Sequence, residues 1–295
     1  MQEKVESLVS SLQQCGYIAD RDLATALSLM DSLSRPLLIE GEAGVGKTAI
    51  AAALACARNT ELIRIQCYEG IDADSVLYEW NYTQQLLHIK LHEKSESVLQ
   101  ESDLYSDRFL LERPLLKAIK QPVSPVLLID EVDRADEGFE AFLLEILSEF
   151  TVTIPEIGTI QATSIPHVIL TSNGSRELSD ALRRRCLFHY ANYPTFDKEL
   201  AILKAHHPNI DQILLRQVTR FVQEIRQWDV TKRPGVAETL DWAQALCDFD
   251  VSALKDQPET VRATLSCLLK TSEDLKYIND KDITATVTEI VTGDT

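Results

Sequence analysis

The sequence predicts an α/β fold in which helices flank a parallel five-stranded sheet and an all-helical domain follows. Short apolar segments alternate with helical stretches up to about residue 193, a pattern typical of a parallel sheet. Beyond that point, apolar residues recur only at helical spacing. The length of 295 residues fits about two domains. Hydrophobic residues at 45% and charged residues at 25% are ordinary for a globular protein.

The predicted sheet lies between an amino-terminal helical segment, residues 1–34, and the helical domain. In the first segment, Val5, Leu8 and Leu12 recur at helical spacing. Five apolar segments within residues 35–193 are then expected to form the strands: 36–40, 62–65, 126–129, 167–171 and 186–190. The third of these is apolar throughout, as expected of a strand buried on both faces.

Residues 194–295 are predicted to form a small all-helical domain with a polar, acidic tail from about residue 271. Its apolar residues fall on two helical stripes. The first stripe contains Ile213, Leu214, Val218, Phe221, Val222 and Ile225, and the second contains Val236, Leu240 and Leu246.

The chain carries 29 Lys and Arg against 46 Asp and Glu, a net charge of −17. Such an acidic surface repels phosphate backbones and anionic lipids, so nucleic acid is not an expected partner. No secretory signal and no stretch of about 18 apolar residues is visible, so no membrane span is expected. The six cysteines contain no CxxC pair, which predicts reduced, mostly buried thiols and a cytoplasmic location.

The strongest motif is a glycine-rich loop between the first predicted strand and an alanine-rich helix. It matches the pattern GxxxxGK[ST], in which the backbone N–H groups and the helix N-terminus surround phosphate oxygens. The lysine reaches the terminal phosphates, and the hydroxyl of Thr48 ligates Mg²⁺. The predicted nucleotide-binding residues of this loop are Gly41, Glu42, Ala43, Gly44, Val45, Gly46, Lys47, Thr48 and Ala49.

Two carboxylates, Asp130 and Glu131, follow the apolar third strand. Asp130 is predicted to bind the nucleotide's Mg²⁺ together with Thr48, and Glu131 to polarise the attacking water. A second acid beside the first favours hydrolysis over simple nucleotide binding. Because no NKxD motif is present, ATP is the expected nucleotide.

Polar residues at three later positions complete the predicted site. Asn173 closes the fourth strand, where its amide can orient the water between Glu131 and the γ-phosphate. Three arginines precede the last strand, and Arg185, with Arg184 as the alternative, is predicted to act as an arginine finger in a neighbouring subunit's site. Arg233 precedes a helix of the second domain, where a cation could sense the γ-phosphate.

Taken together, these motifs resemble those of the AAA+ ATPases, in the order that this family has. The run after Asp130-Glu131, with a β-hairpin at residues 151–162, is similar to the MoxR branch. Residues 66–87, 108–116 and 233–246 resemble its CoxD-like subgroup. This resemblance implies a P-loop NTPase fold with a helical lid, Mg²⁺-dependent ATP hydrolysis and a hexameric ring. It also implies a remodelling chaperone that acts on a protein client, with a von Willebrand factor A domain partner in the maturation of a metalloenzyme.

Two other functions are compatible with parts of the pattern. A DNA-associated AAA+ ATPase, similar to clamp or helicase loaders, also has an arginine–cysteine pair before the last strand, but the net charge of −17 disfavours it. A nucleotide switch that does not hydrolyse ATP needs neither Glu131 nor Asn173 nor a finger, so the presence of all three disfavours that alternative.

Overall fold

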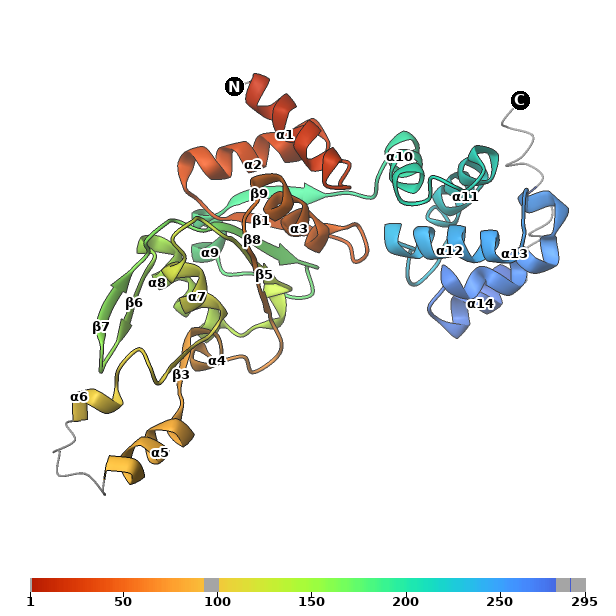
Figure 1. The fold of residues 1–295 in the computed structure, drawn as a ribbon. Coiled ribbons are helices and arrows are strands. Elements are labelled where there is room, and N and C mark those ends of the chain that lie inside the picture. Colours follow the sequence, from red (N-terminus) through yellow and green to blue (C-terminus); the bar gives the residue numbers. More distant parts are fainter. Residues whose placement is uncertain (1, 93–100, 280–286, 288–295) are drawn as a thin grey trace. The chain divides into compact units, whose positions relative to one another are not determined.

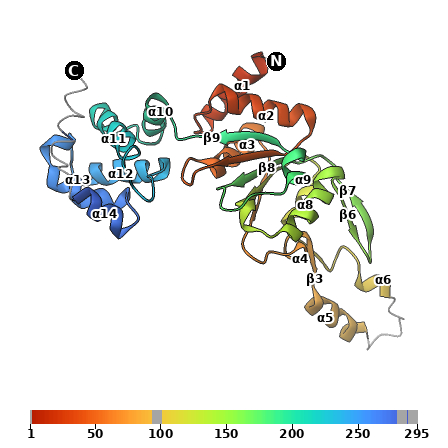
Figure 2. The same cartoon turned by 180° about the vertical axis from the view of Figure 1, so that it is seen from behind.

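The computed structural model describes residues 2–92, 101–279 and 287, and these fall into two compact units. The first comprises the described residues within Met1–Leu8, Asp20–Glu40 and Ile50–Tyr190 (Figures 1 and 2). The second comprises those within Val9–Ala19, Gly41–Ala49 and Ala191–Thr295. The domain boundaries expected after residues 34 and 193 stay a prediction. Apart from residue 287, the expected tail lies outside the described residues from position 280 onward.

A five-stranded sheet in the order β2-β5-β8-β1-β9 forms the centre of the first unit. Its strands are β1 (Leu37–Gly41), β2 (Leu62–Gln66), β5 (Val126–Asp130), β8 (His167–Ser172) and β9 (Leu187–Ala191). The pairs β2–β5, β5–β8 and β8–β1 are parallel. The prediction of an α/β fold with a parallel five-stranded sheet is therefore confirmed, and each strand lies within one or two residues of its expected place.

Burial differs between the central and the edge strands of this sheet. Every residue of β5 is buried, and so is every residue of β8 after His167. On the edge strand β2, Ile63 and Ile65 are buried while Arg64 and Gln66 are exposed. Alternation of this kind marks a strand with one polar face, and that face of β2 carries two side chains that reach the candidate site.

Helices flank the main sheet, and the first unit also contains two small antiparallel sheets (Figures 1 and 2). The small sheets are β3 (Tyr78–Trp80) with β4 (Leu110–Glu112), and β6 (Thr151–Ile154) with β7 (Gly158–Gln161). The helices are α1 (Gln2–Gln14), α2 (Arg21–Leu33), α3 (Lys47–Arg58), α4 (Ala73–Leu77), α5 (Tyr82–His92), α6 (Glu101–Leu104), α7 (Pro114–Lys120), the short 3-10 helix η1 (Val132–Arg134), α8 (Glu137–Glu149) and α9 (Asp180–Arg185).

Side-chain caps begin several of these helices at the residues where the sequence offers an oxygen acceptor. Asp20 Oδ1 accepts from the Leu23 N–H at 2.8 Å, and Asp136 Oδ1 accepts from the Phe139 N–H at 2.8 Å. Each carboxylate satisfies an N–H group that the helix leaves without a partner in its first turn. At the other end of α8, Phe150 adopts a left-handed conformation with φ of 50°, which ends the helix and leads into β6.

The cysteines differ from their expected state. Cys67 and Cys186 are buried free thiols, whereas Cys247 is exposed and Cys267 is half-buried. The remaining two, Cys15 and Cys56, are disulfide-bonded. The expectation of six reduced, mostly buried thiols is therefore wrong, since sequence spacing carries no information on which thiols the fold brings together.

The second unit contains a helical bundle with its own apolar core. The bundle consists of α10 (Phe196–His206), α11 (Gln212–Ile225), α12 (Val236–Asp248), η2 (Leu254–Asp256), α13 (Pro258–Thr264), η3 (Leu265–Cys267) and α14 (Ser272–Asn279). Trp242 is fully buried at its centre, where its ring lies 5.0 Å from that of Phe221. One member of the predicted stripe is wrong: Ile213 is 61% exposed because it lies in the first turn of α11 and faces away from the core.

A buried ion pair connects three helices of this bundle. The two carboxylate oxygens of Glu199 accept from Arg226 at 2.6 and 2.7 Å, and Glu199 Oε1 also accepts from the Thr239 hydroxyl at 2.9 Å. Glu199 and Arg226 are 0% and 4% exposed. Loss of one partner leaves the other charge buried without compensation, which is strongly destabilising even where the intact pair adds little.

We therefore expect Glu199→Ala to lower the free energy of unfolding of the helical bundle by about 3–5 kcal/mol. Urea unfolding followed by tryptophan fluorescence and circular dichroism measures this loss. Asp241→Ala is the matched control, because Asp241 lies exposed on α12 and its loss should change stability by less than about 0.5 kcal/mol. Equal losses of unfolding free energy in the two variants would show that the Glu199–Arg226 pair contributes no more to stability than an exposed residue.

Candidate functional site

The glycine-rich loop after β1 has the backbone of a phosphate-binding loop. Gly44 and Gly46 have φ values of +78° and +91°, which residues with side chains rarely adopt. A Cβ at Gly41 would lie 2.3 Å from the Ala191 carbonyl oxygen, so this position also requires glycine. The loop leads directly into the N-terminus of α3, where backbone N–H groups are left without helical partners. Such a loop and helix start fit a phosphate group.

Lys47, the first residue of α3, is only 7% exposed. Its ammonium group donates to the carbonyl oxygens of Gly41 at 2.6 Å and Glu42 at 2.7 Å. The lysine is thus turned back across its own loop, and the positive charge lies over the glycine-rich turn. Thr48 and Ala49 follow it in the first turn of the helix.

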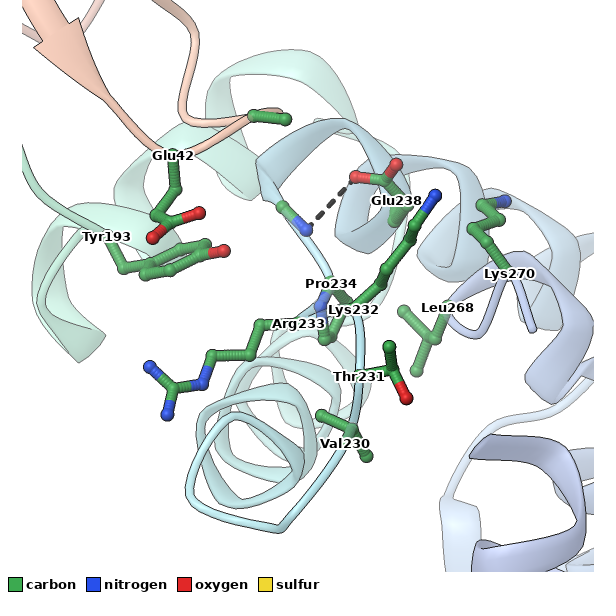
Figure 3. Close-up of a pocket in the computed structure, with 12 residues that line it drawn as sticks. Glu42, Tyr193, Val230, Thr231, Lys232, Arg233, Pro234, Glu238, Leu268 and Lys270 are labelled. Atoms are coloured by element: carbon green, nitrogen blue, oxygen red, sulfur yellow. Dashed lines mark hydrogen bonds between the residues drawn. The ribbon is translucent and has the colours of Figure 1, made fainter. Parts of the chain in front are cut away.

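A cavity of about 600 Å³ lies beside this loop within the second unit (Figure 3). Its walls include Glu42 and Ala43 of the loop, Tyr193, and Arg233 from the segment before α12. Arg233 and the phosphate loop therefore line the same cavity, and the role of Arg233 as a γ-phosphate sensor stays a prediction. In Figure 3 the ammonium group of Lys232 lies on the side of Glu238, and the Arg233 guanidinium lies on the opposite side of the segment.

Backbone contacts fix the start of α12 on the phosphate loop. The Val236 N–H donates to the Gly44 carbonyl oxygen at 2.8 Å. A Cβ at Gly235 would lie 2.7 Å from Gly44 Cα, so only glycine allows this approach. Glu238 Oε2 accepts from the Gly235 N–H at 3.0 Å and completes the capping of the helix. No pattern in the sequence indicates this contact, because the two glycines are far apart in the chain.

Asp130 ends β5, which lies between β2 and β8 in the main sheet, and Glu131 follows it. Asp130 is 3% exposed. Its Oδ1 accepts from the Thr171 hydroxyl, and its Oδ2 pairs with Arg64 at 2.6 Å. The Glu131 N–H donates to the same Thr171 oxygen at 2.9 Å, and Glu131 has a left-handed φ of 54°. The strained backbone at this residue positions the Glu131 carboxylate.

Three side chains surround the Glu131 carboxylate. Gln66 Nε2 donates to Oε2 at 3.1 Å, and the Arg134 guanidinium pairs with the same oxygen at 3.1 Å. On the other side, Asn173 Nδ2 lies 3.5 Å from Oε1. The structure thus brings together the predicted base and the predicted sensor, although the two are far apart in the sequence.

The loop that begins at Asn173 is fixed by a carboxylate of η1. Asp133 accepts from the N–H groups of Asn173 and Ser175 and from the Ser175 hydroxyl. Burial by itself raises the pKa of Asp133, but the hydrogen bonds from Ser175 and Asn173 outweigh it and lower the pKa below its ordinary value. Farther along the loop, the buried carboxylate of Glu140 accepts from Arg176 and from the Ser179 N–H.

The arginines of α9 have different environments. Arg183 is half-buried and donates to Glu40 at 2.9 Å. Arg184 and Arg185 are exposed, and Arg185 donates to the Ser148 hydroxyl of α8. Within the described part of the chain, no hydrogen bond joins the guanidinium of either exposed arginine to Glu131 or Asn173. The Arg35 side chain fixes the end of α9 by donating to the carbonyl oxygens of Arg184 at 2.6 Å and Arg185 at 3.0 Å.

Cys67 lies beneath the carboxylate cluster, where its N–H donates to the Asp130 carbonyl oxygen at 2.9 Å. Burial, with the negative charges of Asp130, Asp133 and Glu131, raises the pKa of this thiol to about 12. A thiol with so high a pKa is protonated at neutral pH and is a poor nucleophile. Cys67 is therefore not suited to act as a nucleophile in this cluster.

Comparison with known proteins decides the family. Residues 36–186 match the profile of the AAA domain, dynein-related subfamily, which is half of the chain. The chain belongs to this family of AAA domains. The match begins just before β1 and ends after α9, so it contains the phosphate loop, the carboxylates, Asn173 and the α9 arginines. The AAA+ part of the predicted resemblance is confirmed.

Curated relatives of this AAA protein are distant. It is 23% identical to an uncharacterized protein of Staphylococcus saprophyticus, over 81% of the chain and 86% of that protein. It is 24% identical to the gas vesicle ATPase GvpN of Haloferax mediterranei, over 66% of the chain and 57% of that protein. Among solved structures, the match to a mutant of RuvB from Thermotoga maritima covers 90% of this chain and 70% of that one, with 16% identity and a TM-score of 0.48.

Sequence reasoning missed several residues of the AAA domain's candidate site. Arg64 and Gln66 carried a usable signal, since their alternation with Ile63 and Ile65 marks the polar face of a strand next to β5. Thr171 and Asp133 carried none, because a threonine in a strand and an aspartate in a turn are routine at such places. Two absences also hold for the residues described: no three His, Cys, Asp or Glu side chains form a metal-binding group, and no helix there has the length and hydropathy of a bilayer span.

Proposed function

We propose that this AAA protein is an ATPase that hydrolyses ATP to ADP and phosphate and uses the reaction to remodel a protein client. The observation that carries the proposal is the cluster at the carboxyl end of β5, where Glu131 lies within reach of Asn173. A protein that only binds nucleotide needs no carboxylate facing an amide at this place. The match of the chain to the gas vesicle ATPase of Haloferax mediterranei supports the same activity.

In this mechanism the phosphate loop, residues 41–46, and Lys47 bind the phosphates, and Arg233, which lines the same cavity as the loop, responds to the γ-phosphate. Glu131 polarises the attacking water, and the Asn173 amide orients it. Arg185, or Arg184, comes from a neighbouring subunit and stabilises the charge that develops on the transferred phosphoryl group. An arginine at such a place raises turnover by about 10³–10⁵ in related reactions.

Thr48 and Asp130 would hold Mg²⁺, which neutralises charge on the phosphates when it is bound. The donor set fits this ion, since a hydroxyl and a carboxylate are hard oxygen ligands. Asp130 has one oxygen fixed by Thr171, and its other oxygen faces Arg64, an exposed side chain that can move aside. Binding of Mg²⁺ here would therefore require Arg64 to give up its ion pair with the carboxylate.

The finer parts of the proposal follow from the resemblance to the MoxR branch and its CoxD-like subgroup. They are a cytoplasmic hexameric ring, a partner with a von Willebrand factor A domain, and a client that is a metalloenzyme under maturation or activation. The predicted division into residues 1–34, 35–193 and 194–295 belongs to the same proposal. No observation favours a DNA-associated function or a switch without hydrolysis.

The test is the specific ATPase activity measured over a wide range of protein concentrations. Because the finger is supplied by a neighbour, we expect turnover per subunit to rise with concentration and then reach a plateau. Glu131→Gln protein from the same purification controls for contaminating ATPases. Flat activity requires a mass measurement, which separates a stable ring from a monomer with a complete site. Activity no higher than that of the control would contradict hydrolysis by the isolated chain.

A further inference from the structure

A single buried carboxylate fixes the backbone of the loop that begins at Asn173. Asp133 is 3% exposed. Its two oxygens each accept from the backbone N–H of Asn173 at 3.2 Å. The Oδ2 atom also accepts from the Ser175 N–H at 2.9 Å and from the Ser175 hydroxyl at 2.6 Å. All of these donors belong to residues 173–175, so the hydrogen bonds of this carboxylate hold one loop.

Asp133 also lies close in the chain to Glu131. Glu131 caps the 3-10 helix η1, and its left-handed φ of 54° fixes the direction in which the helix leaves β5. Asp133 is the second residue of that helix. One short segment therefore carries both the Glu131 carboxylate and, two residues later, the acceptor for the Asn173 backbone N–H. The segment sets the distance between Glu131 and Asn173.

That distance is sensitive, because Asn173 Nδ2 lies 3.5 Å from Glu131 Oε1, at the outer limit of a hydrogen bond. A small displacement of the loop would separate the two groups. Displacements of about 1 Å in groups that position a reaction can lower rates by about 10²-fold. The Asn173 amide is therefore useful only if its backbone is held where Asp133 holds it.

We propose that Asp133 is a positioning residue for hydrolysis, which acts on turnover through Asn173 and has no contact with the nucleotide. The inference rests on the proposed ATPase function. Its chemistry requires a carboxylate, since an ionised aspartate only accepts hydrogen bonds. An asparagine at this position has one accepting oxygen, and its NH₂ group would face donors of Asn173 or Ser175. Asp133→Asn should thus release part of the loop with almost no change in volume.

The experiment is a double-mutant cycle on the full chain with Asp133→Asn, Asn173→Ala and the combination of the two. We expect Asp133→Asn to lower kcat by about 10- to 100-fold while the affinity for a fluorescent ATP analogue stays the same. In the Asn173→Ala background, the same substitution should change kcat by less than about twofold, because the group it positions is gone. Asp136→Asn is the matched control: it makes the same change of residue type three positions away, keeps an oxygen acceptor for the α8 cap and should leave kcat unchanged.

Amide hydrogen exchange in the peptide spanning residues 171–178 provides a readout without turnover. Asp133→Asn should speed exchange at residues 173–175, and Asp136→Asn should not. If Asp133→Asn fails to fold, Ser175→Ala takes its place, since it removes the bond at 2.6 Å and should lower kcat only when Asn173 is present.

Three results would overturn the inference: unchanged exchange, unchanged kcat, or an equal loss of kcat with and without Asn173. A failure of the proposed function is recognised separately, as wild-type turnover no higher than that of Glu131→Gln. In that case exchange alone decides whether Asp133 holds the loop.

Discussion

Lys47→Ala prevents the protein from binding ATP, whereas Glu131→Gln leaves binding intact and stops turnover; this is the result we expect from the two parts of the site. Lys47 is 7% exposed, and its ammonium group lies over the glycine-rich turn that is shaped for phosphate. Charge-assisted hydrogen bonds contribute about 1.5–3 kcal/mol each, so loss of the lysine should weaken ATP binding by roughly 100-fold or more.

Glu131→Gln removes the negative charge that polarises water while it keeps the size of the side chain and one of its two accepting oxygens. General base catalysis contributes about 10²–10⁴-fold, and turnover should fall by that factor. Because Glu131 interacts with Gln66, Arg134 and Asn173 at the end of β5, the substitution should not disturb the phosphate loop. Affinity for ATP should therefore change by less than about threefold.

Equilibrium titration with a fluorescent ATP analogue and a phosphate-release assay measure the two effects separately. Lys90→Ala and Glu137→Gln are the matched controls, since both residues are exposed on helices away from the site and should change neither quantity. Tight ATP binding by Lys47→Ala would contradict the assignment of the phosphate loop. Normal turnover by Glu131→Gln would contradict the assignment of the base.

The sheet could be predicted from sequence because its central strands are buried on both faces. Val126–Ile129 and residues 167–171 are nearly continuous apolar runs, which occur in few other settings. The phosphate loop could be predicted equally well, since three glycines that the local backbone geometry requires are followed directly by Lys47 and Thr48. Local patterns of this kind determine which elements form and roughly where they begin and end.

Contacts between segments far apart in the chain could not be predicted from the sequence in the same way. Arg35 binds the carbonyl oxygens of Arg184 and Arg185, and Asp133 binds the loop at Asn173. Both contacts join residues that only the folded sheet brings together, and neither residue type is unusual where it stands. The same holds for Gly44 and Gly235, whose backbones touch across most of the chain. Sequence patterns therefore predicted the groups that do chemistry better than the groups that position them.

The second large effect concerns the arginines of α9. Arg185→Ala should reduce turnover by about 10³–10⁵-fold and leave ATP affinity nearly unchanged, because the finger acts on charge that develops in the transition state. Arg185 is exposed and makes one described side-chain hydrogen bond, to Ser148, which a neighbouring site can replace. Arg184→Ala should have a smaller effect, although its exposed position allows the opposite order.

Mixing two inactive proteins shows whether the finger acts in a neighbouring subunit. Arg185→Ala subunits keep Glu131, and Glu131→Gln subunits keep Arg185, so a mixed ring contains some sites with both groups intact. Turnover in the mixture should exceed that of either protein alone and should be highest near equal amounts. Arg183→Ala is the control, since Arg183 already pairs with Glu40 of its own chain and its loss should not be complemented. A mixture no more active than its components would place the arginine in its own subunit's site or outside catalysis, and a larger loss in Arg184→Ala would move the finger by one residue.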